Sequence, residues 1–197
     1  HHPAASTTVL PTLLPHAAGL RFAEEVKRLT EVRENPRRPL VVIIGGVKAE
    51  DKLPAIEAMT KIADYVLVGG RIALELLHSF NGRGTNVKVA GLKEGGLDIS
   101  DEIVEEWKSI IKQAGMIVWN GPLGKFEDPK YDQTRKVIEM ILDSGAEVVI
   151  GGGDSVAALS QYGLFQKAQQ KAFVSVGGGA MLKLLADGTL PTINVLD

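Results

Sequence analysis

The chain has 197 residues, of which 45% are hydrophobic and 23% charged, with a formal net charge of −2. This composition is typical of a globular domain with a full core, and it gives no indication of a nucleic-acid or membrane-surface partner. No stretch reaches the ~18 apolar residues of a membrane span. The lack of cysteine excludes a disulfide framework, a cysteine nucleophile and a cysteine zinc site. These features fit a cytoplasmic protein, and we also expect it to be a monomer.

The first part of the chain predicts two segments. Residues 1–18 are rich in proline, alanine, serine and threonine, which favours irregular or extended structure. Residues 19–34 place Phe22, Val26 and Leu29 at helical spacing with charged residues between them, which predicts an amphipathic helix. The prolines of residues 35–39 end that helix.

From residue 40 onwards, an apolar strand followed by a glycine turn and a helix recurs five times. The strands are expected at residues 40–44, 65–68, 116–119, 148–150 and 172–175, and their turns at Gly45, Gly69, Gly121, Gly151 and Gly177. The helices after these turns are expected at residues 50–62, 71–79 and 131–142, from residue 156, and at residues 180–186. A further helix is expected from Ser100, a short strand at residues 87–89 within a loop over 81–96, and an irregular tail over residues 190–193.

Strands that alternate with helices predict an α/β fold, here a Rossmann-like three-layer αβα arrangement with a mainly parallel sheet of about six strands. Such sheets bind ligands beyond the carboxyl ends of their strands, which is where all five glycine turns fall. Glycine lets a ligand approach the backbone closely, and a helix N-terminus attracts anions. We therefore expect a nucleotide at this edge of the sheet.

Lys48 and Lys52 follow the first turn four residues apart, which would place them on one face of the next helix. Two ammonium groups there would offset the charge of a phosphoryl group in transfer. The alternative is that both are ordinary solvated lysines.

For three further side chains, the sequence allows either a structural or a ligand-binding role. Asp154 follows the turn Gly151–Gly153 and would either cap its helix or hold Mg²⁺ on nucleotide phosphates. Ser155 would either cap the helix or bind phosphate, and Glu127 would either bind ribose hydroxyls or be a plain surface acid. The four histidines show no spacing that suits a metal site.

Five pieces of the sequence together resemble the C-terminal, nucleotide-binding domain of the phosphoglycerate kinase family. They are Gly45-Gly46-Val47-Lys48-Ala49-Glu50-Asp51-Lys52, Gly69-Gly70, Trp119-Asn120-Gly121-Pro122-Leu123-Gly124-Lys125-Phe126-Glu127, Gly151-Gly152-Gly153-Asp154-Ser155 and Ser175-Val176-Gly177-Gly178-Gly179-Ala180. The third and fourth pieces are highly specific. The resemblance extends from about residue 5 to the end of the chain.

This resemblance implies reversible phosphoryl transfer between 1,3-bisphosphoglycerate with ADP and 3-phosphoglycerate with ATP, in glycolysis and with Mg²⁺. It implies a remnant of an N-terminal domain and crossover at residues 1–18, an interdomain helix at 19–34 and the nucleotide-binding domain at 35–197. The phosphoglycerate site would belong to an N-terminal domain absent from this chain. The isolated chain is therefore expected to bind nucleotide with little turnover.

The site residues carried over by the resemblance fall into three groups. Catalytic roles would go to Lys48, Lys52, Gly152, Gly153, Gly178 and Gly179, and nucleotide contacts to Gly46, Lys48, Lys52, Gly69, Gly70, Asn120, Pro122, Glu127, Gly151, Gly152, Gly153, Asp154 and Ser155. Of these, Gly69 and Gly70 would line the adenine pocket and Glu127 would bind the ribose. Asp154 would be the residue that serves the metal.

The sequence also departs from the family pattern. Arg71 replaces a third glycine, Val176 a threonine and Met181 a small polar residue, and His1-His2 stands where the family has His-Arg. The changes at Arg71, Val176 and Met181 motivate an alternative, a nucleotide-binding regulatory or assembly module without kinase activity. A dehydrogenase that binds a dinucleotide is poorly supported, because G-x-G-x-x-G is absent.

Overall fold

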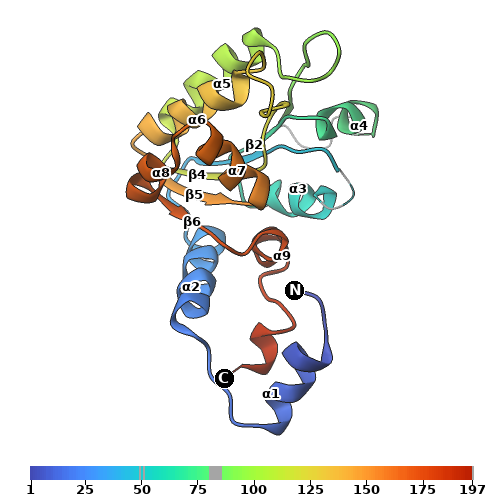
Figure 1. Cartoon of the computed structure of the whole chain (residues 1–197), viewed down its shortest axis with the longest axis vertical. Helices are drawn as coiled ribbons and strands as arrows, with labels where there is room; N and C mark the ends of the chain where they lie inside the picture. The colour runs from blue at the N-terminus through green and yellow to red at the C-terminus, as the bar shows by residue number, and fades with distance from the viewer. Residues whose placement is uncertain (49, 51, 80–85, 197) are drawn as a thin grey trace.

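The computed structural model describes residues 1–48, 50, 52–79 and 86–196. One six-stranded sheet lies at its centre in the order β3-β2-β1-β4-β5-β6, and its paired strands are all parallel (Figure 1). The strands are β1 (Leu40–Ile44), β2 (Tyr65–Val68), β3 (Val87–Val89), β4 (Met116–Asn120), β5 (Glu147–Gly151) and β6 (Ala172–Val174). This arrangement confirms the predicted Rossmann-like α/β fold, and the strand order reverses between β1 and β4.

Helices cover both faces of the sheet and complete the three layers. They are η1 (Ala5–Val9), α1 (Leu10–Leu13), α2 (Leu20–Glu34), α3 (Leu53–Met59), α4 (Ile72–Ser79), α5 (Asp101–Gln113), α6 (Gln133–Asp143), α7 (Gly153–Gln161), α8 (Phe165–Lys171), α9 (Gly179–Asp187) and η2 (Ile193–Val195). None of the helices in the described ranges is long and apolar enough to cross a membrane.

The continuous apolar runs become strands that are buried on both sides. All five residues of β1 are fully buried, and alternate positions feed two separate cores. Val41 and Ile43 point to the face covered by α5, α6, α7 and α8, whereas Val42 and Ile44 point to the face covered by α2, α3, α4 and α9. This two-sided burial explains why the strands show no polar alternation.

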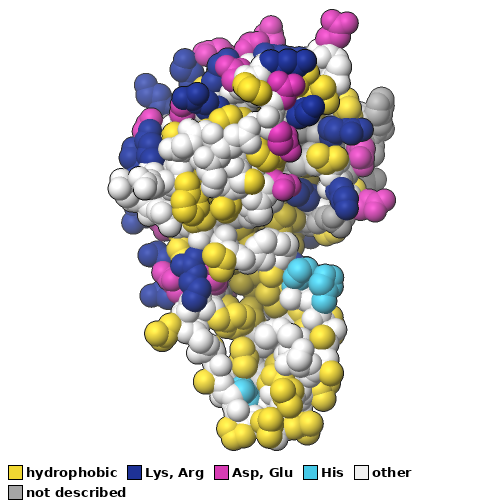
Figure 2. Space-filling model, viewed as in Figure 1, with side chains coloured by type: hydrophobic (Ala, Val, Ile, Leu, Met, Phe, Trp, Pro, Cys, Tyr) yellow, Lys and Arg dark blue, Asp and Glu magenta, His cyan; other side chains and the backbone are white. Residues whose placement is uncertain are grey.

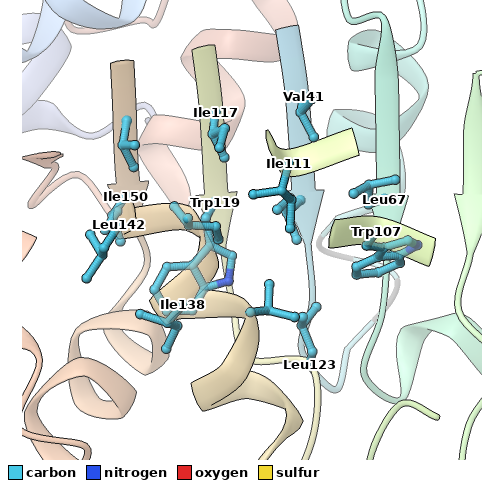
Figure 3. Packing of buried hydrophobic residues seen from close by; sticks show 14 of the residues in the cluster. Val41, Leu67, Trp107, Ile111, Ile117, Trp119, Leu123, Ile138, Leu142 and Ile150 are labelled. Atoms are coloured by element: carbon cyan, nitrogen blue, oxygen red, sulfur yellow. The ribbon is translucent and has the colours of Figure 1, made fainter. Parts of the chain in front are cut away.

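The first core contains both tryptophans (Figure 3). Trp107 of α5 is 0% exposed and Trp119 of β4 is 1% exposed. The indole N–H of Trp119 donates to the carbonyl of Gly121 at 2.8 Å. The core thus fixes the turn that follows β4, which is one of the predicted ligand turns.

The expectation that residues 1–18 are irregular or extended is wrong, because a π-helical turn and α1 occupy much of this segment. Threonine hydroxyls supply part of the reason, since Thr8 donates to the carbonyl of Ala4 at 2.9 Å and Thr12 to that of Val9 at 2.7 Å. Pro11 is tolerated because it lies in the first turn of α1. This segment lies with the C-terminal tail in the lower part of the molecule, which Figure 2 shows to be largely apolar, and Leu13 is 71% exposed.

Several predicted boundaries also shift. The helix expected at residues 50–62 is only α3, which begins at Leu53 and ends at Met59, and residue 51 lies outside the described residues. Helix α8 was not anticipated, and the tail contains the short helix η2. The strand at residues 87–89 and the Ser100 cap, whose hydroxyl accepts the N–H of Ile103 at 3.4 Å, are confirmed. Residues 80–85 lie outside the described residues, and they include residues 81–85 of the expected loop over 81–96.

Candidate functional site

The turns after β1, β2 and β4 touch through their backbones at the carboxyl edge of the sheet. Gly70 has φ +71°, and a Cβ built on it would lie 2.7 Å from the nitrogen of Gly46 and 3.1 Å from the carbonyl oxygen of Pro122. No side chain can occupy that position, so the glycine is required for three turns to meet. The sequence pattern predicted that these turns fall at one edge of the sheet, and the structure confirms that placement.

These turns form the floor of a cavity of about 580 Å³, a size typical of small-molecule sites. Its walls are Gly46, Val47, Gly70, Arg71, Gly96, Leu97, Pro122, Gly124, Lys125, Phe126, Glu127 and Asp154. Five residues of the predicted site are among them, namely Gly46, Gly70, Pro122, Glu127 and Asp154. They come from four segments that are distant in sequence and adjacent only through the sheet.

Other predicted site residues do not line this cavity. They are Lys48, Lys52, Gly69, Asn120, Gly151, Gly152, Gly153, Ser155, Gly178 and Gly179. Gly69 packs inward, since a Cβ on it would lie 2.8 Å from Leu123 and 3.2 Å from Ile99. Gly178 and Gly179 begin α9, beyond β6 and at the far end of the same sheet edge.

The expectation that Lys48 and Lys52 share a helical face is wrong, because α3 starts after both. Lys48 is exposed in the turn, whereas Lys52 is half-buried. The ammonium of Lys52 donates to the carbonyl of Gly45 and to Oδ1 of Asn120, the latter at 3.1 Å. Lys52 therefore bridges the turns after β1 and β4.

Asn120 ends β4 and is 3% exposed. Its Oδ1 accepts from Lys52, while its Nδ2 is buried and has no hydrogen-bond partner among the described residues. The Nδ2 atom lies 3.2 Å from where a Cβ of Gly152 would be, so it faces the turn after β5. It is a donor directed at the predicted phosphate turn.

Ser155 is fully buried beneath this turn, and its hydroxyl is already used twice. It donates to the carbonyl of Gly151 at 2.7 Å and accepts the N–H of Gly121 at 2.7 Å. As placed, the side chain holds two turns together and is not accessible to a phosphate. It is also not the helix cap, because Gly152 occupies that position with φ +97°.

Asp154 lies in the first turn of α7, exposed and on the cavity wall, and it makes no capping hydrogen bond. Of its two predicted roles, the helix cap is wrong, and the residue lies on the cavity wall. No group of three or more metal-binding side chains occurs in the described part of the chain. A single carboxylate nevertheless suits Mg²⁺, which often takes one or two protein ligands besides phosphates and water.

The sequence did not predict the wall formed by Gly96 and Leu97, which the buried Asp98 supports from behind. Asp98 is 1% exposed and accepts the N–H groups of Ile99 at 3.0 Å and Gln133 at 3.2 Å. Burial raises the pKa of this carboxyl above its ordinary value. The neighbouring Leu97 carbonyl accepts the backbone N–H of Lys125 at 2.8 Å, which joins this wall to the turn after β4.

The loop after β4 is held from below by α6. The hydroxyl of Thr134 accepts the N–H groups of Leu123 and Gly124, each at 3.1 Å. Gly124 must be glycine because a Cβ would collide with the Asp98 carboxylate. No spacing in the sequence signalled these contacts, since they join positions 10 to 26 residues apart that meet only in the fold.

Comparison with known proteins gives a consistent result. The family model for phosphoglycerate kinase matches residues 1–90 and 78–188. The chain is 32% identical to a phosphoglycerate kinase of Rhodopirellula baltica, with 100% of this chain and 62% of that protein covered. It is 33% identical to one of Herpetosiphon aurantiacus, with 100% and 61% covered.

Solved structures agree with these sequence matches. The phosphoglycerate kinase of Coxiella burnetii superimposes with a TM-score of 0.85 at 27% identity, over 99% of this chain and 62% of that one. That of Pyrococcus horikoshii shares the fold with a TM-score of 0.82 at 24% identity. The chain spans about three-fifths of the length of the curated relatives it matches.

Proposed function

Because the chain belongs to the phosphoglycerate kinase family, we propose that it is the nucleotide-binding half of such a kinase and takes ATP or ADP with Mg²⁺ at the carboxyl edge of its sheet. The observation that carries the proposal is the cavity of about 580 Å³ in which Gly46, Gly70, Pro122, Glu127 and Asp154 converge. The proposed reaction is reversible phosphoryl transfer between 1,3-bisphosphoglycerate with ADP and 3-phosphoglycerate with ATP.

In this proposal the residues bind and orient rather than react covalently, as phosphoryl transfer requires. Glu127 accepts hydrogen bonds from the ribose hydroxyls, and Gly46 and Gly70 leave room for the nucleotide against the backbone. The buried Nδ2 of Asn120 and the free amides at the start of α7 donate toward the phosphates. Bound Mg²⁺ would neutralise phosphate charge, and Asp154 is the residue that would hold it.

Lys48 and Lys52 have different proposed tasks. Lys48 is exposed and is free to contact the phosphoryl group in transfer. Lys52 donates to Gly45 and Asn120, so it holds the two turns at a fixed separation and lies close to where the phosphates would bind. The triple-glycine turn before α9 would steady the transferred group from the far side of the edge.

The phosphoglycerate substrates are proposed to bind on the part of the family's length that this chain does not span. The isolated chain is then expected to bind nucleotide with little turnover. The test is to assay the chain alone and mixed with the separately produced N-terminal part of a relative, such as the Coxiella burnetii kinase. Activity that requires both parts supports the proposal, whereas robust turnover by the chain alone contradicts the need for a second part.

The regulatory alternative makes a different prediction. If the chain binds MgADP but never gains activity with any N-terminal part, a non-catalytic module becomes the better account. If it binds no purine nucleoside diphosphate with Mg²⁺, both accounts fail.

A further inference from the structure

The cavity has two chemically different ends. Asp154 reaches it from the turn after β5, while Gly70 and Arg71 reach it from the turn after β2. Three strand spacings separate β2 from β5 in the sheet order β2-β1-β4-β5, which is roughly 14 Å at the usual inter-strand distance. The start of α7 lies at the β5 end, so phosphates belong there and the base belongs at the β2 end.

The walls at the β2 end are mostly apolar. Leu97 and Pro122 contribute hydrophobic surface, and Gly70 and Gly96 contribute backbone. A Cβ built on Gly70 would lie 3.1 Å from the Pro122 carbonyl oxygen, and one built on Gly96 would lie 3.5 Å from Leu74 of α4. This is a suitable surround for the faces of a purine. Arg71 adds a planar fork of N–H donors to the same end.

Arg71 has no evident structural task. Its side chain is exposed, and among the described residues its guanidinium has no hydrogen-bond or ion-pair partner. It also directly precedes Ile72, the first residue of α4, where the helix dipole disfavours a cation. A residue that is unfavourable for local structure and makes no stabilising contact in return is often part of a functional site. Arg71 lines the cavity, so the cavity is that site.

We propose that Arg71 determines base specificity and that the chain prefers 6-oxopurine nucleotides, those of guanine or hypoxanthine, to adenine nucleotides. Guanine and hypoxanthine present two acceptors, O6 and N7, on one edge, which matches the donor fork of arginine. Adenine presents N7 beside the N6 amino donor, so only one of the two hydrogen bonds forms. The inference rests on the proposed function, because it assumes that the cavity holds a nucleotide.

The test is calorimetric titration of the whole chain with ADP, GDP and IDP, each with Mg²⁺. The wild-type chain should bind GDP and IDP about 5- to 100-fold more tightly than ADP, the range expected for one bidentate contact. IDP lacks the 2-amino group of GDP, so equal affinity for these two assigns the preference to the O6/N7 edge. A GDP preference that IDP does not share overturns the proposal.

Two variants sharpen the test. Arg71→Gln should reverse the preference toward ADP, because a glutamine amide pairs with N6 and N7 of adenine. Arg135→Gln is the matched control, because this exposed arginine lies on α6 and forms a surface ion pair with Glu139. Its GDP-to-ADP ratio should equal that of the wild type. A ratio unchanged in Arg71→Gln overturns the proposal.

The outcomes separate the two claims. If ADP and GDP bind equally to the wild-type chain, the base preference fails and the nucleotide site stands. If none of the three nucleotides binds, the proposed function itself fails.

Discussion

At the scale of single residues, two lysines four positions apart have different surroundings. Lys48 is exposed, while the half-buried ammonium of Lys52 donates to the Gly45 carbonyl and to Asn120 Oδ1. Lys52 therefore contributes to the shape of the apo site, and Lys48 does not. Only the fold reveals this difference, because the two side chains are chemically identical.

Replacing each lysine by methionine should separate these roles. Lys52→Met should lower the free energy of unfolding by about 1.5–3 kcal/mol, which is the usual contribution of a hydrogen bond to a charged group. It should also weaken MgADP binding. Lys48→Met should weaken binding while changing stability by less than about 0.5 kcal/mol. Urea unfolding and calorimetry measure the two effects, and equal stability losses would contradict the assignment.

Ser155 offers a second residue-scale prediction. Ser155→Ala would leave the Gly121 N–H and the Gly151 carbonyl without their partner in a buried site, so it should cost about 1–3 kcal/mol of stability. Ser160→Ala on the same helix is the control. Its exposed hydroxyl donates to Val156 at 2.9 Å, and its loss should cost less than about 0.5 kcal/mol. Equal unfolding midpoints for the two variants would show that Ser155 does not hold the turns.

At the scale of elements, the turn after β5 rests directly on α9. A Cβ built on Gly151 would overlap the sulfur of Met181, which is fully buried. The residue that departs from the family pattern therefore fills the space beneath the predicted phosphate turn. We therefore expect the effects of substitutions at Gly151 and Met181 on stability to depend on each other.

A double-mutant cycle tests this coupling. Gly151→Ala should destabilise the chain by about 1–3 kcal/mol through overpacking, and Met181→Ala by about 2–5 kcal/mol through a cavity. The double variant should lose less than the sum, because the new methyl group occupies part of the space left by Met181. Additive losses in thermal unfolding would contradict a direct contact.

Asp98 links the loop after β3 to the start of α6, and its protonation should influence stability. Burial is the largest cause of its raised pKa, with Lys93 lowering and Asp132 raising it by charge. The folded state thus holds this proton more tightly than the unfolded state, whose pKa is near the ordinary value of 3.8. Its stabilising contribution is full below that value and declines as pH rises through the folded pKa.

Asp98→Asn should therefore cost the most stability in acid. The difference in unfolding free energy between wild type and variant should shrink as pH is raised from about the unfolded pKa toward neutrality. Urea denaturation across this range measures it. A difference that grows with pH would show that the ionised form is the one the fold favours.

Particular elements explain how far the sequence could predict the structure. The run Leu40–Ile44 and its counterparts predicted the strands because a two-sided buried strand needs uninterrupted apolar residues. Helix α1 was missed because threonine-to-carbonyl bonds and a proline in the first turn are local details that composition hides. Helix α8 was missed because its seven residues bury only Ala168.

Part of the candidate site could likewise be predicted from the sequence, and part could not. Glycine turns identified the carboxyl edge, and the cavity there includes Gly46, Gly70 and Pro122. The exact start of α3 and the burial of Ser155 were not predictable, because both depend on packing between segments distant in sequence. The wall at Leu97 was missed for the same reason.

At the scale of the whole molecule, one edge of the sheet gathers the turns that carry the family's motifs. The cavity draws its walls from the segments that follow β1, β2, β4 and β5 and from the loop after β3, on both sides of the point where the strand order reverses. The lobe of residues 1–20 lacks lysine, arginine and acidic residues, and it lies apart from the strands that form this edge (Figures 1 and 2). The central claim, that this cavity binds nucleotide, therefore concerns the α/β body alone.

The most direct test is a titration of the ¹⁵N-labelled chain with MgADP, followed by amide chemical shifts. The account predicts saturable shifts at the cavity, including the amides of Gly46, Gly70, Gly124 and Glu127, with little change in α8 at the far edge of the sheet. The absence of shifts at millimolar MgADP, or shifts confined to the surface around Arg21 and Phe173, would contradict it.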